Sequence, residues 1–319
     1  MRLALIIDDY LPNSTRVGAK MFHELACYYV SKGHDVTVIT PDQEQKDKLV
    51  KSQIDNVKVW RFSSGAIKDV SKIKRAINET LLSVRAWQAI SREVTPNTFD
   101  GVIYYSPSIF FGKLVEKIKI RCNCKAYLVL RDLFPQWAID AGLIKSQSVI
   151  EKYFRFFEKS SYDQADMIGL MSERNLQHFN DVTQFRYSTE VLRNWASLDV
   201  QRAFCNKESI RSRLRLENKI VYFYGGNIGH AQDMTNLMKL VKAMQPYDNA
   251  HFLFVGQGDE VELIQRLARD WRLNNFSYLP AVSQSEFLNI LSDIDIGLFS
   301  LSANHTAHNF PGKLSLIHI

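Results

Sequence analysis

The chain has 319 residues, of which 46% are hydrophobic and 23% are charged, the composition of an ordinary soluble globular protein. The net charge of +6 fits an anionic ligand, an acidic membrane surface or nucleic acid, and does not choose among them. No segment approaches the roughly 18 uninterrupted apolar residues of a membrane-spanning helix. At about 150 residues per domain, the length predicts two domains.

The four cysteines predict reduced thiols. A disulfide framework is typical of much shorter secreted chains, so we expect a cytoplasmic protein. Cys122 and Cys124 are separated by one residue, which is not the spacing of a zinc knuckle, and no second pair matches them. We therefore expect neither these two nor Cys27 and Cys205 to bind a metal.

Short apolar runs alternate with amphipathic helical segments along the first half of the chain. Leu3–Ile7 is predicted as a buried strand, and the helix that follows spans Val17–Val30 and ends before Gly33. Further strands are predicted at Val36–Ile39, Val57–Phe62, Asp100–Tyr105, Ala126–Leu130 and Asp166–Met171. Ser172 and Glu173 mark the start of another helix. This alternation indicates a parallel sheet with helices on both faces.

A second series of the same kind begins near residue 219. Its strands are predicted at Ile220–Tyr224, His251–Val255, Phe276–Leu279 and Ile294–Phe299. Its helices are predicted at Met234–Met244, Glu260–Trp271 and Ser285–Leu291. A Ser283-x-x-Glu286 capping box opens the last of these helices. We therefore predict an α/β fold of two tandem Rossmann-like domains, residues 1–195 and 219–319, joined by a polar hinge over residues 196–218.

Residues Ile67–Val94 predict one long amphipathic helix with an excess of basic residues around it. The apolar residues that recur at helical spacing are Ile67, Val70, Ile73, Ile77, Leu81, Val84 and Trp87 or Ile90. A basic amphipathic helix can lie in a membrane interface. A helix that packs its apolar face on the core is the commoner case. Both interpretations stay open on the sequence alone.

The turns that follow the strands are the places to look for a site, because ligands of open α/β sheets bind beyond the carboxyl ends of the strands. The first such turn lacks the G-x-G-x-x-G of nicotinamide enzymes, and Gly18 is its one point of close backbone approach to a phosphate or sugar. Arg131 and Asp132 follow another strand. Asp132 can orient or deprotonate a hydroxyl, and Arg131 can hold an anion. A local Arg–Asp ion pair is the alternative.

The second series carries two glycine turns. The first reads Gly225-Gly226-Asn227-Ile228-Gly229, which removes Cβ atoms and leaves N–H groups at the mouth of a strand. Together with the positive end of the next helix, this turn suits a diphosphate, and a purely structural turn is the alternative. Gly256 and Gly258 repeat the arrangement, but Asp259 and Glu260 would repel phosphate. We expect the second turn to contact a nucleoside or to be structural.

Taken together, these residues resemble the family-4 glycosyltransferases of the GT-B fold. The matching marks run in order through nearly the whole chain. They are Asp9-Tyr10-Leu11-Pro12 with Gly18-Ala19, Lys32–Thr40, Leu192-Arg193-Asn194-Trp195-Ala196, Gly225–Gly229, Val255–Gly258 and Asp295–Leu301. More narrowly, Arg131–Trp137 and Asn309–Lys313 are similar to the WbuB-type enzymes of O-antigen and capsule assembly, which are taken to transfer N-acetyl-L-fucosamine.

The resemblance implies a retaining hexosyltransferase that needs no metal and no cofactor. Its donor would be a nucleotide sugar, with a UDP-sugar expected, and its acceptor a polyprenyl-diphosphate-linked saccharide. The N-terminal domain would bind the acceptor and the C-terminal domain the donor. The expected location is cytoplasmic and peripheral on the inner membrane, in O-antigen, lipopolysaccharide or capsular polysaccharide synthesis, with no nucleic acid as partner.

The family motifs also imply site residues. Asp132 and Arg131 would be catalytic. Substrate contacts would come from Gly18, Arg193, Asn194, Gly225, Gly226, Asn227, Gly229, Gly256, Gly258 and Lys313. The turn N–H groups and the Lys313 cation would stabilise charge on the leaving diphosphate. The D-x-D spelled by Asp293-Ile294-Asp295 binds metal–diphosphate in another glycosyltransferase fold, but here it opens a strand, and no metal site is predicted.

The sequence departs from the family pattern in two places. Gln232 stands where many members carry a lysine, and the paired-glutamate clamp on the donor is missing. The chain stops at Ile319, where a helix and at least two strands should follow, so we expect an incomplete second domain and a catalytically inactive chain. Two other functions stay open: a nucleotide-sugar epimerase-type enzyme, and a non-catalytic nucleotide-binding fragment.

Overall fold

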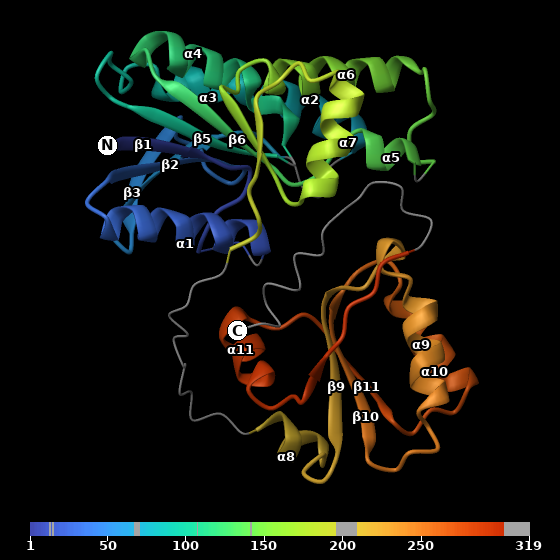
Figure 1. The fold of residues 1–319 in the computed structure, drawn as a ribbon. Helices are drawn as coiled ribbons and strands as arrows, with labels where there is room; N and C mark the ends of the chain where they lie inside the picture. The colour runs from blue at the N-terminus through green and yellow to red at the C-terminus, as the bar shows by residue number, and fades with distance from the viewer. Residues whose placement is uncertain are drawn as a thin grey trace. The chain divides into compact units, whose positions relative to one another are not determined.

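The computed structural model describes residues 1–12, 14, 16–66, 71–106, 108–140, 142–195 and 209–302. These residues form two compact units, residues 1–195 and 209–302, each built on its own sheet (Figure 1). Helices alternate with mostly parallel strands in both units, so the predicted α/β fold class is confirmed.

The first unit contains an eight-stranded sheet with the order β3-β4-β2-β1-β5-β6-β7-β8. The strands are β1 (Arg2–Ile6), β2 (Asp35–Asp42), β3 (Leu49–Ile54), β4 (Val57–Ser63), β5 (Gly101–Ser106), β6 (Lys125–Leu130), β7 (Met167–Leu170) and β8 (Thr189–Val191). Neighbouring strands pair in parallel, except that β3 runs antiparallel to β4. β1 lies between β2 and β5, so the carboxyl ends of β1, β5 and β6 meet at one edge.

Helices cover both faces of this sheet, as Figure 1 shows. They are α1 (Val17–Ser31), α2 (Lys72–Thr80), α3 (Leu82–Ile90), α4 (Gly112–Cys122), α5 (Gln136–Asp140), α6 (Val149–Tyr162) and α7 (Glu173–Thr183). Alternate residues of β1 enter two cores: Leu5 packs with Phe22 of α1, and Ile6 packs with residues of α3 and α4. Burial on both faces explains why these strands read as continuous apolar runs in the sequence.

The predicted helix over Ile67–Val94 is two helices, α2 and α3, which meet at Leu81; residues 67–70 lie outside the described residues. The Thr80 hydroxyl donates to the carbonyl of Ala76 at 2.6 Å, a bond that bends helices. The core-packing interpretation of the apolar stripe is wrong for three of its members. Their exposed fractions are 54% for Ile77, 36% for Leu81 and 48% for Val84. The buried residues of α3 are Leu82, Ser83, Ala86 and Ile90.

The second unit contains a four-stranded parallel sheet with the order β11-β10-β9-β12. The strands are β9 (Ile220–Asn227), β10 (Ala250–Gln257), β11 (Phe276–Leu279) and β12 (Ile296–Gly297). The helices are α8 (Ile210–Leu214), α9 (Met234–Ala243), α10 (Val261–Asp270) and α11 (Gln284–Leu291). α9 and α10 pack on one side, and α8 and α11 contribute to the core on the other. Ser283 accepts a hydrogen bond from the Glu286 N–H at 3.3 Å, which confirms the Ser283 half of the predicted capping box, while Glu286 Oε1 pairs with Arg213 at 3.2 Å.

Two strands were not predicted. Four of the six residues of β3 are exposed, so it lacks the apolar run that marks the buried strands. β8 has three residues at the other edge of the sheet. β12 is shorter at both ends than the predicted Ile294–Phe299. Just before it begins, the Asp295 carboxylate accepts a hydrogen bond from the Val221 N–H at 2.7 Å.

Candidate functional site

Acidic and aromatic side chains gather at the carboxyl edge of the first sheet. Asp8 follows β1, Tyr105 lies near the end of β5, and Asp132 follows β6. These residues share one edge because β1, β5 and β6 are neighbours in the sheet. Burial raises the pKa of the Tyr105 hydroxyl, and the charges of Asp132 and Asp8 raise it further. Gly18 leaves room for the aromatic ring, because a Cβ there would lie 3.0 Å from Cε1 of Tyr105.

The carboxyl groups of Asp8 and Asp132 resist ionisation. Burial raises the pKa of Asp132, Arg131 partly offsets this rise, and the charge of Asp8 adds to it. Burial also raises the pKa of Asp8 against the opposing charge of Arg16, whose Nη1 lies 3.5 Å from Oδ2 of Asp8. A carboxyl group with a raised pKa at a strand end is suited to accepting a proton or a hydrogen bond from a hydroxyl.

Arg131 is 7% exposed and holds the last residues of the first unit. Its Nη1 donates to the carbonyl of Leu192 at 2.7 Å, and its guanidinium lies over the Trp195 ring at 5.1 Å from the centroid. Its Nη2 donates to the carbonyl of Arg193 at 3.5 Å. These bonds go to backbone carbonyls and not to Asp132, so a local Arg–Asp ion pair is not the arrangement found. Burial lowers the pKa of Arg131.

Two buried polar atoms at this edge lack partners. Nε of Arg131, a donor, and Oδ1 of Asn194, an acceptor, make no hydrogen bond to any residue that the structure describes. Trp195 follows Asn194 and donates from Nε1 to the carbonyl of Met21 at 3.0 Å, which fixes this segment against α1. Buried polar atoms without partners are uncommon, and a ligand is one explanation for them. Arg193, by contrast, is exposed and pairs with Glu173 at 2.7 Å.

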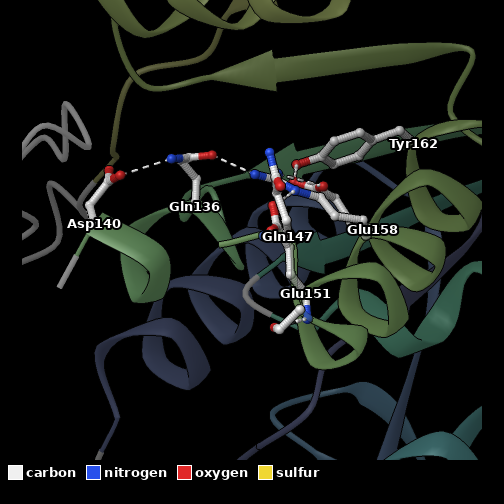
Figure 2. A network of polar contacts seen from close by, with 8 residues as sticks. Gln136, Asp140, Gln147, Glu151, Glu158 and Tyr162 are labelled. Atoms are coloured by element: carbon white, nitrogen blue, oxygen red, sulfur yellow. Dashed lines mark hydrogen bonds and ion pairs between the residues drawn. The ribbon is translucent and has the colours of Figure 1, made fainter. Parts of the chain in front are cut away.

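A polar network holds the loop after β6 against α6 (Figure 2). The side-chain carbonyl of Gln136 accepts from Arg155, and its amide donates to Asp140 at 2.8 Å. Arg155 donates to Glu158 at 2.9 Å, and the Tyr162 hydroxyl donates to the other oxygen of Glu158 at 3.1 Å. Burial raises the pKa of Glu158, against the charge of Arg155. This network therefore anchors the loop that begins with the candidate catalytic pair.

In the second unit the two glycine turns lie side by side at the ends of β9 and β10. Their pairing continues into the turns, with Gly256 opposite Gly226. A Cβ on Gly256 would lie 1.8 Å from the carbonyl oxygen of Gly226, and one on Gly258 would lie 2.1 Å from that of Ile228. Gly226 has a φ of +112°, which favours glycine, and Gly225 is enclosed by two phenylalanine rings. Gly256 and Gly258 are required by the close approach of the two backbones, Gly225 by the neighbouring rings and Gly226 by its φ.

Gly229 differs from the other turn glycines. Its φ is −148°, and an added Cβ would meet only the ends of two side chains, Oδ1 of Asp259 at 2.6 Å and Nδ2 of Asn227 at 2.8 Å. The backbone N–H groups of Gly229, His230 and Ala231 have no hydrogen-bond partner within the described part of the chain. Successive unpaired N–H groups are what an anion-binding turn offers.

Carboxylates crowd the same turn. His230 lies 2.7 Å from Glu260 and 3.5 Å from Asp259. The Asp233 side chain caps α9 by accepting from the N–H of Asn236 at 3.2 Å. The expectation that the positive end of this helix takes a diphosphate therefore needs correction, because a carboxylate already occupies that end. The N–H groups of the turn before α9 are the better anion donors.

The D-x-D residues have structural partners. Asp293 accepts from the Ser209 hydroxyl at 2.7 Å, and Asp295 pairs with Arg211 at 2.6 Å. Both aspartates therefore tie the start of the second unit to its sheet, away from the glycine turns at the opposite strand ends. Lys313, the predicted cation for the diphosphate, lies outside the described residues.

Asp8 and Tyr105 were not predicted as site residues. Asp8 follows the first strand just as Asp132 follows the sixth, and this shared position was the available signal. Their proximity depends on β1 and β6 both flanking β5, which the local sequence does not specify.

The chain is similar to two named relatives, while no family model matches it. Over 99% of its length it is 21% identical to an Escherichia coli K12 protein named as the colanic acid biosynthesis glycosyl transferase WcaI, and the match covers 81% of that protein. Over 59% of its length it is 22% identical to a Pseudomonas aeruginosa protein named as the glycosyltransferase WbjE, and the match covers 47% of that protein.

Solved structures share the fold. The UDP-forming α,α-trehalose-phosphate synthase of Burkholderia xenovorans matches with a TM-score of 0.70 and 8% identity, over 94% of this chain and 79% of its own. HepE of Anabaena, solved with UDP and glucose, matches with a TM-score of 0.62 and 12% identity, over 95% of this chain and 75% of its own. At such low identity the likeness shows the GT-B fold alone. With the two named relatives, it supports a GT-B glycosyltransferase.

Proposed function

We propose that the protein is a retaining, metal-independent hexosyltransferase of polysaccharide biosynthesis. It transfers a sugar, N-acetyl-L-fucosamine or a related amino or deoxy sugar as in WbuB-type enzymes, from a UDP-sugar to a polyprenyl-diphosphate-linked saccharide. The observation that carries the proposal is the group of Asp8, Tyr105 and Asp132 at one sheet edge, beside the unpartnered donor of Arg131. The named relatives support the reaction class.

We assign binding of the acceptor to the first unit. Asp132 accepts a hydrogen bond from the acceptor hydroxyl and orients its oxygen toward the anomeric carbon. As the new C–O bond forms on the same face, the bond to the diphosphate breaks, and the departing diphosphate takes the hydroxyl proton. The burial that raises the pKa of Asp132 supports this assignment.

The second unit is assigned the donor. The N–H groups of Gly229, His230 and Ala231 bind the diphosphate and stabilise the charge that develops as it leaves. HepE, solved with UDP and glucose, supports a nucleotide sugar as the ligand. No step of this proposal passes through a metal.

The membrane interpretation of α2 and α3 gains support from their exposed stripe, Ile77, Leu81 and Val84. The Thr80 hydroxyl contacts that of Tyr153, so α2 lies against α6, which exposes Phe156 at 63%. Other exposed residues on these two helices are Lys74, Arg75, Val149, Ile150, Lys152 and Lys159. We assign this basic, apolar face to the surface of an anionic membrane. None of the helices described is long and apolar enough to cross a bilayer.

The donor assignment is tested by Gly229→Val, with binding of UDP measured by calorimetry. The extended backbone accepts valine, and the Asp259 and Asn227 side chains can move aside, so the protein should fold and bind UDP at least tenfold more weakly. Gly33→Ala is the control for a destabilising glycine replacement outside the turn: its φ of +79° costs stability, but its added Cβ lies in open space and should leave UDP affinity unchanged. Equal UDP affinity in the folded Gly229→Val protein would refute the assignment.

The acceptor assignment is tested by Asp132→Asn in a chain that carries the C-terminal segment of a full-length relative, with transfer to a polyprenyl-linked saccharide as the readout. UDP binding should be unchanged and transfer should fall by about 100-fold, because the amide no longer offers the carboxylate acceptor that orients the hydroxyl for attack. Conversion of the free nucleotide sugar without any acceptor would instead favour the epimerase-type function.

The membrane assignment is tested by reversing Lys74 and Arg75 to Glu. Binding to anionic vesicles should fall about tenfold or more, at about 1 kcal/mol for each basic residue. Lys51 and Lys58, reversed on β3 and β4, are the control. If both double variants bind equally well, the exposed stripe is not a membrane surface.

A further inference from the structure

A second cluster of polar side chains lies outside the site described above. His23 and Cys27 are one turn apart on α1, and the turn between β3 and β4 brings Asp55 to them. His23 Nε2 lies 2.9 Å from Oδ2 of Asp55 and 3.6 Å from Sγ of Cys27. All three atoms lie within 4.8 Å of one another.

We propose that His23, Cys27 and Asp55 bind a divalent cation of the zinc class. An imidazole nitrogen, a thiolate sulfur and a carboxylate oxygen are the three ligand types that zinc takes in proteins. This inference concerns the stability of the first unit and does not rest on the proposed transfer reaction. It also revises the expectation that none of the cysteines binds a metal.

The separation of the histidine and cysteine ligand atoms fits such an ion. With bonds of about 2.0–2.1 Å to nitrogen and about 2.3 Å to sulfur, tetrahedral geometry separates these two ligand atoms by about 3.5 Å. The observed separation of His23 Nε2 from Cys27 Sγ is 3.6 Å. His23 and Asp55 are at hydrogen-bonding distance and need to move apart by about 0.5 Å to accept the ion between them. Exposed carboxylates turn by this amount at little cost.

The backbone holds the ligands in place. His23 and Cys27 project from one rigid helix at the i, i+4 spacing that puts two side chains on one face. Asp55 and Asn56 have φ values of 48° and 65°, so they form the tight turn of a two-residue hairpin. The Asp55 side chain is 72% exposed, whereas that of His23 is 12% exposed. An ion therefore reaches the buried ligand from the Asp55 side, and water can complete its coordination.

Tyr10 supplies the outer partner that metal-binding histidines have. Its hydroxyl lies 2.7 Å from Nδ1 of His23. When Nδ1–H donates to this hydroxyl oxygen, the lone pair of Nε2 points to Cys27 and Asp55, which is the tautomer that binds a metal. On binding, the Cys27 thiol loses its proton to solvent and bonds to the ion as thiolate.

The cluster lies where a bound ion would join three segments of the first unit. Tyr10 lies in the loop between β1 and α1, which also carries Asp8. A cation at His23 ties this loop, α1 and the β3–β4 turn together. The ion acts through Tyr10 on a loop of the candidate acceptor site and does not touch the diphosphate.

The test titrates the metal-free chain with Co²⁺, a spectroscopic probe for zinc sites. The wild-type chain should bind with a thiolate-to-cobalt absorption band, and Zn²⁺ should displace the cobalt. Cys27→Ser should lose this band. Cys124→Ser is the matched control, since Cys124 is also a half-buried free thiol, and it should keep the band.

Two further variants distinguish a loss of metal binding from a loss of folding. Asp55→Asn changes an exposed turn, so it should fold normally and bind Co²⁺ at least tenfold more weakly, while Tyr10→Phe should weaken binding by about 10–100-fold. Zn²⁺ should raise the midpoint of thermal unfolding of the wild type and not of Cys27→Ser. Absence of a thiolate band in the wild type, or the same band in Cys27→Ser, would overturn the proposal.

Discussion

The carboxyl edges of the two sheets are built from different parts of the chain. In the first unit the edge presents side chains: the carboxyl groups of Asp8 and Asp132 and the guanidinium of Arg131. In the second unit it presents backbone, because glycines let the ends of β9 and β10 and the turns after them run side by side at contact distance. A side chain of the first edge can be replaced to remove one function, whereas replacing a glycine of the second edge disturbs the fold of that unit.

The largest effect is expected for Gly256→Ala. The added Cβ would lie 1.8 Å from the Gly226 carbonyl oxygen, a clash with backbone that only a shift of both turns relieves. We expect a loss of about 4 kcal/mol or more in the free energy of unfolding, measured by urea unfolding with circular dichroism. Gly33→Ala, with a φ of +79° and open space around it, should lose about 1–2 kcal/mol. Equal losses in the two variants would contradict the close approach of the Gly226 and Gly256 backbones as the cause of the larger loss.

Arg131→Met should have the second-largest effect on the free energy of unfolding. Methionine keeps the packing on Trp195 but leaves the carbonyls of Leu192 and Arg193 without donors. A carbonyl left without a partner costs about 1–3 kcal/mol, and the Leu192 carbonyl should account for most of the loss because the bond to Arg193 is 3.5 Å long. We therefore expect about 1–3 kcal/mol in urea unfolding. Arg131→Lys keeps the charge without the planar fork and should recover only part of the loss. Full recovery by lysine would mean that charge, and not geometry, is what matters here.

Asp132→Asn should stabilise the fold while it abolishes transfer. The pKa of Asp132 is raised in the folded chain. Folded Asp132 therefore keeps its proton at pH values where the unfolded chain has already released it. Stability is therefore lost as pH rises between the unfolded and folded pKa values. The variant lacks this loss, so it should exceed the wild type by about 0.5–2 kcal/mol at neutral pH and match it in strong acid. Unfolding free energies measured across pH check this; a constant difference at all pH values would contradict it.

Arg193→Ala should have the smallest effect. Arg193 lies two residues beyond Val191 of β8, near Arg131, but its pair with Glu173 is exposed on both sides. Exposed ion pairs contribute little, so thermal unfolding should stay within the error of the measurement. A clear loss of stability would show that Arg193, like Arg131, holds the segment in place.

The sequence predicts the central strands well, because strands buried on both faces must be apolar throughout. β10, which lies between β9 and β11, is found at Ala250–Gln257 where His251–Val255 was predicted, and all but the last of its residues are buried. The surface elements are predicted less well: β3 is exposed, and the stripe of Ile77, Leu81 and Val84 has helical spacing without being buried. Spacing shows which residues share a face of a helix, and only the tertiary fold decides what that face contacts.

The sequence could indicate which turns carry site residues, but it could not indicate which of those residues lie close together in the fold. Asp132 was found because it follows an apolar strand. Its approach to Asp8 depends on strand order, and the approach of Asp55 to His23 depends on the hairpin folding back toward α1. Such contacts join residues more than 30 positions apart, and no local pattern encodes them.

The antiparallel strand β3 bears on how the molecule avoids aggregation. A parallel sheet with a bare edge offers unpaired backbone groups to any other extended chain. Here β3 covers one margin, where its exposed Lys51 pairs with Glu93, and charged residues on an edge strand discourage the docking of a further strand. The other margin ends in β8, whose three residues are too short to template a new strand. The first sheet is thus protected on both sides against recruiting a second molecule.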